Sequence, residues 1–450
     1  MSRRIIVIGG LAAGPSAASK ASRVNPNAEV ILFERGEHIS YAICEVPYYV
    51  SGEVSKDGLV AFTPKTLKEK KGVDVRVWHQ VETINPTKRS VTVRDLRTGA
   101  ILEEHYDRLI IATGSRPRML GVKGEDARNV FNVKSLDQGL QIREFIESTK
   151  PRKAVIIGGG YIGMEMAEAL RAQKLEVTIL HRYSLPMVGL ERQTREGVRE
   201  ELEKNGVQFI SNVRTEGFVV DKDRKVTHVV TTNGSYEADL VILSLGVIPN
   251  NEVARRAGIR VGISGGILTD QRQLTNVDNI YAAGDCCEVK NIVSNKQMYL
   301  PLATIGSRAG WVAGENAAGG KAIFRGAIRA IAVKVFDIQV AQVGIGSQEA
   351  RDSSFDVAVE SISAWSRVAI MPGSKKVTII TIADKRSRRL LGANVYGEEG
   401  AVLRANTLAV GIQHRMTIDE IQQWDLAYSP PFTPLWDPIL VAANATRKKL

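Results

Sequence analysis

The chain has 450 residues, of which 44% are hydrophobic and 24% charged, a composition that is typical of soluble globular proteins and excludes a disordered or fibrous chain. At roughly 150 residues per domain, this length predicts about three domains. Lys and Arg number 60 against 49 acidic residues, a net charge of +11, which favours either anionic partners or simply a solvated basic surface. The three cysteines exclude a disulfide-stapled scaffold. With no apolar run of about 18 residues, we predict a cytoplasmic protein without a membrane span.

The N-terminal part predicts a nucleotide-binding unit rather than a secretory signal. Its apolar run Ile5–Ile8 is short and meets a glycine turn, without a small-residue cleavage site. We expect a buried strand there, then a helix over 12–23 and a strand at Glu29–Phe33. The apolar run 109–112, which ends at Thr113-Gly114, closes the unit.

The same order of elements returns further along the chain. A strand at Ala154–Ile157, a glycine turn, a helix over 161–173, a strand at Glu176–Leu180 and a run over 240–245 ending at Gly246 form the second copy. Short runs of Val, Ile and Leu that alternate with helices are typical of parallel sheets covered on both faces. Two such units predict two Rossmann-like dinucleotide-binding domains, each with its ligand at the carboxyl edge of the sheet.

From about Ile331 the pattern changes to antiparallel strands at 333–336, 377–382 and 393–396, followed by helices over 401–414 and 417–424. The predicted fold class is therefore α/β, with a C-terminal α+β domain. We predict the domain boundaries 1–117 with 245–328, then 118–244, then 329–450.

The two glycine turns differ in quality. Gly158-x-Gly160-x-x-Gly163 is a complete dinucleotide fingerprint between a strand and a helix. Its glycines permit the tight turn, the approach of a pyrophosphate and close helix packing. In the first turn Gly9 and Gly14 hold the outer positions, but Leu11 stands where the middle glycine is expected, beside Gly10.

The residues after the second strand of each copy predict which nucleotide binds. Glu34 follows the first copy's strand, where an acid bonds ribose hydroxyls. His181 and Arg182 occupy the matching place in the second copy, where a cation would attract a 2′-phosphate. We therefore predict FAD in the first site and NADPH in the second, with NADH possible. The alternative is a surface His and Arg without a ligand.

Cys44 lies shortly after Glu34, where a flavin held by the first site could reach it. It has no second cysteine nearby, so disulfide chemistry would use this thiol and an external one. A lone cysteine is more often a small core residue. We interpret the adjacent Cys286 and Cys287 as buried packing.

Several segments together resemble the pyridine nucleotide–disulfide oxidoreductases over nearly the whole chain. The single cysteine, with Tyr428-Ser429-Pro430-Pro431-Phe432 and Trp436-Asp437-Pro438, resembles the branch of coenzyme A–disulfide reductases, related NADH oxidases and persulfide reductases. The segments that carry the family resemblance are Gly9–Gly14, Ser40–Tyr49, Ala112–Gly114, Gly158–Glu165 and Tyr281–Asp285.

This resemblance implies roles for individual residues. Cys44 would be the redox-active thiol, and Tyr428 would reach the partner subunit's site, which makes the third domain a dimerisation domain. Lys20, Arg23 and Ser40 would contact the substrate, with the two cations on coenzyme A phosphates; a solvated helix face is the alternative for the cations. The dinucleotide-binding set implied is Gly9, Gly10, Ala13, Gly14, Glu34, Arg35, Thr113, Gly114, Asp285, Pro301 and Ala303 for FAD, and Gly158, Gly160, Tyr161, Ile162, Gly163, Glu165, His181, Arg182 and Gly246 for NAD(P)H.

The chain departs from the branch beside the cysteine. Ile43 and Glu45-Val46 replace the branch's Asn and Gly-Leu, and Ile370-Met371 replaces a tyrosine pair. Glu45 would raise the pKa of the Cys44 thiol if its side chain points the same way. These departures concern the substrate more than the fold.

We therefore predict an FAD-dependent NAD(P)H:disulfide oxidoreductase, a homodimer that reduces a small disulfide or persulfide of the coenzyme A type. We expect no metal, no nucleic acid and no membrane as partners. The alternatives are an NAD(P)H oxidase or quinone reductase on the same flavin, and a non-catalytic redox sensor.

Overall fold

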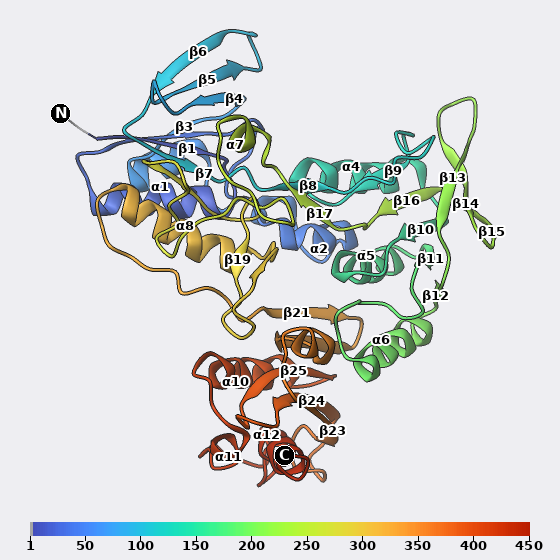
Figure 1. Cartoon of the computed structure of the whole chain (residues 1–450). Coiled ribbons are helices and arrows are strands. Elements are labelled where there is room, and N and C mark those ends of the chain that lie inside the picture. Colours follow the sequence, from blue (N-terminus) through green and yellow to red (C-terminus); the bar gives the residue numbers. More distant parts are fainter. Residues whose placement is uncertain (1–2) are drawn as a thin grey trace.

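The computed structural model describes residues 3–450, arranged as three regions (Figure 1). Met1 and Ser2, which the first predicted domain included, lie outside the described residues. No helix within residues 3–450 combines the length and hydropathy needed to cross a membrane.

The first region is built on a parallel sheet with the strand order β18-β7-β1-β2-β3. Helices α1 (Ala13–Val24), α3 (Pro64–Lys71) and α8 (Ala303–Ala317) pack on one face of this sheet, because alternate strand residues and helix alanines share one apolar core. The strands are β1 (Arg4–Ile8), β2 (Glu29–Phe33), β3 (Asp74–Arg76), β7 (Arg108–Ile111) and β18 (Ile280–Ala282).

The second region repeats this plan, with the strand order β12-β11-β10-β16-β9. Helices α4 (Leu136–Thr149) and α5 (Tyr161–Ala172) pack on one face, and α6 (Arg192–Lys204) adjoins them. The strands are β9 (Val130–Asn132), β10 (Lys153–Ile157), β11 (Glu176–Leu180), β12 (Val207–Ile210) and β16 (Leu240–Leu243). The predicted internal repeat is thus visible in the topology.

The opposite face of each parallel sheet carries a three-stranded antiparallel sheet, which the sequence analysis did not predict. The first contains β4 (His79–Asn85), β5 (Ser90–Asp95) and β6 (Ile101–His105). The second contains β13 (Thr215–Val220), β14 (Val226–Thr231) and β15 (Gly234–Glu237). The repeat therefore extends beyond the two glycine turns.

The first two regions are joined by a two-stranded antiparallel ribbon. The chain leaves the first region through β8 (Ser115–Pro117) and returns through β17 (Val247–Pro249), which pair with each other. The thiol segment comprises the short 3-10 helix η1 (Ile43–Glu45) and α2 (Val46–Ser51). Val46 and Val50 of α2 pack into the core of the second region. Minor elements are η2 (Lys56–Gly58), α7 (Glu252–Arg256), β19 (Val289–Lys290) and β20 (Gln297–Met298).

The third region is an antiparallel sheet, as its sequence predicted, and its strand order is β21-β22-β25-β24-β23. Two of these strands, β22 and β23, were not predicted. Its strands are β21 (Ala330–Val335), β22 (Ile338–Gly344), β23 (Val357–Trp365), β24 (Lys376–Asp384) and β25 (Leu390–Gly397), and its helices are α9 (Ser347–Arg351), α10 (Ala401–Gln413), α11 (Ile418–Ile421) and α12 (Pro438–Arg447). The predicted helix over 417–424 is shorter in the structure: the capping box of Thr417 and Glu420 sets its start, and the chain turns after Ile421. The predicted fold class is confirmed.

Candidate active site

The first glycine turn is closed by contacts that leave no room for side chains. Gly9 has φ 110°, and a Cβ atom there would clash with the carbonyl oxygen of Ala112. A Cβ atom on Gly14 would clash with the carbonyl oxygen of Gly9. Glu34 completes the turn, because its Oε2 accepts a hydrogen bond of 2.6 Å from the Gly10 N–H.

The second glycine turn reproduces these contacts. Gly158 has φ 112°, and a Cβ atom added there would clash with the carbonyl oxygen of Ser244. A Cβ atom added to Gly163 would clash with the carbonyl oxygen of Gly158. His181 takes the place of Glu34, because its Nδ1 accepts a hydrogen bond of 3.0 Å from the Gly159 N–H. Gly160 differs, since a Cβ there would meet no atom within 4 Å.

His181 brings no positive charge to the second turn at physiological pH. Its side chain is buried, with 8% exposed. Burial, Arg195 and Arg182 together lower the pKa of its imidazole to about 4, so the ring is neutral at physiological pH. A neutral ring that accepts at Nδ1 carries its proton on Nε2. Of the two residues predicted to meet a 2′-phosphate, Arg182 is therefore the charged one; it is exposed and stacks on the ring of Tyr183.

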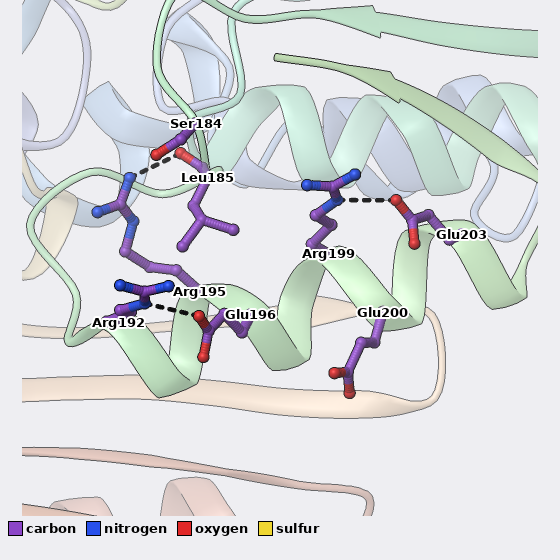
Figure 2. A pocket seen from close by; sticks show the side chains of 8 residues that line it. All are labelled: Ser184, Leu185, Arg192, Arg195, Glu196, Arg199, Glu200 and Glu203. Atoms are coloured by element: carbon purple, nitrogen blue, oxygen red, sulfur yellow. Dashed lines mark hydrogen bonds and ion pairs between the residues drawn. The ribbon is translucent and has the colours of Figure 1, made fainter. Parts of the chain in front are cut away.

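A hollow of about 630 Å³ lies beside the loop that follows Arg182 (Figure 2). Arg195 fixes this loop, because its guanidinium donates to the carbonyl oxygens of Leu185 at 2.7 Å and Pro186 at 2.8 Å. The neighbouring arginines Arg192 and Arg199 are each paired with a glutamate one helical turn further along α6. The side chain of Arg195 thus holds the loop that follows Arg182.

The two helices that follow the glycine turns fit phosphate ligands. α1 and α5 have no side-chain hydrogen bond at their N-caps, so their first N–H groups are free of such caps. Helix N-termini of this kind attract anions. With the open space at Gly160, the residues present fit two dinucleotides.

The other residues expected near the first dinucleotide hold the turn or surround it. Ala13 is buried beneath Gly284 and Gly310, and Arg35 is exposed. Thr113 Oγ1 donates to the carbonyl oxygen of Asn250 at 2.6 Å, and the Asn250 amide donates back to Thr113 at 2.8 Å.

The remaining residues predicted for the cofactor and substrate sites lie in turns or near the start of α8. Gly114 and Gly246 both have positive φ values, 67° and 85°, on either side of the interdomain ribbon. Pro301 and Ala303 lie at the start of α8. Ser40 has φ 48°, its N–H donates to the Gly10 carbonyl oxygen, and its hydroxyl is buried without a partner.

Cys44 lies in η1, open to solvent, whereas Cys286 and Cys287 are buried. Although the thiol is accessible, the surrounding protein removes enough hydration to raise its pKa, and Glu165 and then Glu45 raise it further. Lys134 acts in the opposite direction. Glu45 therefore opposes the thiolate as its sequence position indicated, but Glu165 has the larger effect.

Glu165 projects from α5 beside a cavity of about 290 Å³ that Pro47, Tyr48 and Glu168 also line. Burial, and then the negative charge of Glu168, raise the pKa of Glu165 to about 7. Glu165 can therefore hold or release a proton near neutral pH. Tyr161 and Ile162, predicted for the same site, are half-buried at the start of α5.

Asp285 is bonded to a residue that the sequence analysis missed. Lys134 Nζ lies 3.0 Å from Asp285 Oδ2, and Ser115 Oγ donates to the same oxygen at 2.9 Å. Lys134 follows β9 as a single lysine, 151 residues from Asp285. No local pattern marks such a pair.

The two cations predicted for the substrate differ in their surroundings. Lys20 is ion-paired with Glu315 at 2.9 Å and lies over the ring of Trp311. Arg23 is exposed on the last turn of α1. The structure thus leaves Arg23 freer than Lys20 to meet an anion.

Tyr428 lies on the third region, with 49% of its surface exposed. Phe432, Leu435 and Trp436 are also exposed on this segment. The segment ends at Asp437, which forms a buried ion pair with Arg404 at 2.9 Å.

Comparison with known proteins agrees with this geometry. Residues 3–310 match the pyridine nucleotide-disulphide oxidoreductase family, and residues 331–437 match the dimerisation domain of that family. The chain belongs to this family. Its members use FAD and NAD(P)H, which confirms the two predicted classes of cofactor.

Individual relatives cover almost the whole chain. An NAD(P)H coenzyme A polysulfide/persulfide reductase of Pyrococcus horikoshii is 34% identical over 448 residues, with 99% of each chain covered. An NADH oxidase of Methanocaldococcus jannaschii is 29% identical over 450 residues, again with 99% of each chain covered. The solved structure of an NAD-dependent persulfide reductase from A. fulgidus superposes with a TM-score of 0.96 at 34% identity, covering 99% of this chain and 83% of that one.

Proposed function

We propose that this protein reduces a small disulfide or persulfide of the coenzyme A type through the single thiol Cys44. The observation that supports this most is the contrast among its cysteines. Cys44 is exposed among the titratable groups Glu165, Glu45 and Lys134, while Cys286 and Cys287 are buried. A nucleophilic thiol must be reachable, and among the three cysteines Cys44 is the exposed one.

The chain's own residues support one half of the reaction directly. The Cys44 thiolate attacks one sulfur of the substrate, a mixed disulfide forms, and the other sulfur leaves as a thiolate. Glu165 is placed to exchange a proton near neutral pH. When bound, FAD and NAD(P)H supply the electron pair that returns the mixed disulfide to two thiols.

We assign FAD to the first glycine turn, with Glu34 at its ribose end, and NAD(P)H to the second. The exposed Arg182 supports a preference for NADPH, since the neutral His181 offers no carboxylate to repel a 2′-phosphate. We keep the domain boundaries 1–117 with 245–328, 118–244 and 329–450 as part of this proposal.

The coenzyme A assignment rests on the relatives' names and on Arg23. The exposed Arg23 at the end of α1 can meet a phosphate, whereas Lys20 would first have to leave Glu315. We place the protein in the cytoplasm, in keeping with three cysteines that are all free.

We also propose a homodimer in which Tyr428 reaches the partner's site. Phe432 is 79% exposed and Leu435 71% exposed, and such an apolar patch favours an interface over solvent. Light scattering should give about twice 49.2 kDa. A monomer at working concentration would remove Tyr428 from this role.

Replacement of Cys44 tests the proposed function. Cys44→Ser should abolish turnover of coenzyme A disulfide and persulfide, yet retain FAD absorbance and flavin reduction by NADPH. Cys286→Ala and Cys287→Ala are matched controls that should affect stability at most. Full disulfide turnover by Cys44→Ser would refute the single-thiol mechanism.

A second candidate function is NAD(P)H oxidation by oxygen. The acidic surroundings that raise the pKa of Cys44 favour it, because they oppose the thiolate on which disulfide exchange depends. Oxygen consumption that survives in Cys44→Ser, with no disulfide turnover in the wild type, would establish this alternative.

A further inference from the structure

The loop over residues 183–190, which follows Arg182, is bonded to its own region in two ways. The Met187 N–H donates to the carbonyl oxygen of Gly159, in the second glycine turn, at 2.7 Å. Arg195 of α6 donates to carbonyl oxygens of the loop (Figure 2). The shape of the loop beside the glycine turn therefore depends on where the start of α6 lies.

The start of α6 is bonded to the third region through Glu191. The Glu191 N–H donates to Asn394 Oδ1 at 2.6 Å. Its carboxylate accepts two bonds from Ser347, one from the N–H at 2.7 Å and one from Oγ at 2.9 Å. Glu191 and Arg195 stand one helical turn apart, since the Arg195 N–H donates to the Glu191 carbonyl oxygen at 3.2 Å. An unbroken series of bonds thus runs from the third region to the loop.

The sheet of the third region carries two buried polar side chains that face this loop. Gln342 and Asn394 lie opposite each other on β22 and β25, and are 3% and 0% exposed. Val340 packs into the core of the second region, so alternation along β22 places Gln342 on the same face. Gln342 Nε2 donates to the Gly189 carbonyl oxygen at 3.1 Å. Because buried polar groups need partners, the loop and the start of α6 stabilise both side chains.

We propose that Glu191 is a positioning residue for the nucleotide site, through which the third region fixes the loop that follows Arg182. Asn394 and Ser347 hold Glu191, and Arg195 holds the loop from the same end of α6. The inference rests on the proposed function, since that function assigns the 2′-phosphate of NADPH to Arg182. It makes selectivity for this phosphate depend on a region outside both dinucleotide-binding units.

Hydrogen–deuterium exchange of the FAD-loaded protein measures the loop without turnover. Glu191→Ala removes both bonds to Ser347, and it removes no helix cap, because the Glu191 side chain makes no capping bond to α6. We expect the peptide over residues 184–191, which contains the bonded Met187 amide, to exchange about tenfold faster than in wild type. Peptides from β10 and β11 should exchange as before.

Three further variants make the result specific. Glu201 lies at the other end of α6, and its Oε1 accepts from the Asp337 N–H of the third region at 3.1 Å. Glu201→Ala therefore breaks a contact between the same two regions but should leave the loop unchanged. Glu191→Gln retains an acceptor for the Ser347 N–H and should stay within about twofold of wild type. Ser347→Ala supplies a second, milder variant if Glu191→Ala does not fold by circular dichroism.

Nucleotide binding tests the link to selectivity. Titration calorimetry compares adenosine 2′,5′-bisphosphate with adenosine 5′-monophosphate, which lacks the phosphate assigned to Arg182. We expect Glu191→Ala to weaken the bisphosphate by about tenfold, because binding must then order the loop, and the monophosphate by less than about twofold. The KM for NADPH should rise while kcat and FAD absorbance are retained.

The outcomes separate this inference from the proposed function. Unchanged exchange of the loop in Glu191→Ala, or equal acceleration in Glu201→Ala, would overturn the role of Glu191. An equal loss of affinity for both nucleotides would overturn its role in selectivity. If wild type binds the two nucleotides equally while Glu191→Ala still accelerates exchange in the loop alone, the anchoring of the loop stands and the assignment of NADPH to Arg182 is refuted.

Discussion

The two glycine turns of this protein are built alike but end in different acceptors. In both turns, side chains are excluded by carbonyl oxygens at the outer glycines, Gly9 with Gly14 and Gly158 with Gly163. The first turn is then closed by the Glu34 carboxylate on the Gly10 N–H, and the second by the neutral His181 ring on the Gly159 N–H.

This difference shows that the backbone of the turn and the charge at the ribose end are set separately. Any acceptor of suitable length can hold the N–H of the turn. The carboxylate brings a negative charge to the ribose end, whereas the imidazole brings none. In the proposed assignment, the choice between NADH and NADPH therefore falls to the neighbouring Arg182.

The largest expected effect comes from filling one turn at a time. Gly163→Val places the Cβ atom of a branched side chain against the Gly158 carbonyl oxygen, and no choice of rotamer removes this clash. We expect NADPH binding to weaken by about a hundredfold or more, with FAD absorbance retained. Gly14→Val should instead lose FAD.

Gly160→Ala is the matched control for this pair. Its added Cβ meets no atom within 4 Å, so the fold should melt as in wild type. Weaker NADPH binding in this variant would report contact with the ligand itself. If Gly163→Val and Gly14→Val lose both cofactors alike, the two turns are not independent.

A smaller effect should appear in how the free energy of unfolding depends on pH, and it concerns His181, the acceptor in the second turn. Folding lowers the pKa of His181 from 6.5 to about 4, so between these values the unfolded chain binds a proton that the folded chain does not. The free energy of unfolding should therefore be unaffected by His181 above pH 6.5, and should fall by about 3 kcal/mol as the pH falls towards 4.

The variant His181→Gln, which can still accept the Gly159 N–H, should lack this component. Urea denaturation of both proteins at pH 7 and pH 4.5 measures it. An identical loss of stability in the two proteins would show that His181 is already protonated in the fold.

The smallest effect concerns Arg182. A charge-assisted bond to a phosphate contributes about 1.5–3 kcal/mol, so Arg182→Ala should lower kcat/KM for NADPH by about tenfold to a hundredfold. The value for NADH should change little. The control is Arg152→Ala, which removes an exposed arginine just before β10, at the end of that strand away from the glycine turn. A wild-type preference for NADH would contradict the predicted specificity.

The sequence predicted the repeated strands well, because buried parallel strands are continuous apolar runs. Glu29–Phe33 and Glu176–Leu180 agree with β2 and β11 at both ends. The antiparallel sheets opposite the helices were missed. In β6, for example, Ile101 and Leu102 are exposed, so hydrophobic alternation gives no clear signal there.

The candidate site was only partly predictable for a related reason. Glycine turns and the residues after them are local patterns, but the Lys134–Asp285 pair joins loops of different sheets. Likewise, the sequence placed Lys20 on a suitable helix, yet its pairing with Glu315 of α8 depends on how two distant helices meet. Such contacts are decided by tertiary packing.

The position of α2 gives the thiol segment two attachments. By chain connection, Cys44 belongs to the first dinucleotide region, but Val46 and Val50 directly after it are part of the second region's core. The ribbon of β8 and β17 is a second connection between these two regions. Because α2 packs in the core of the second region, any displacement of that region relative to the first would also displace the residues that follow Cys44.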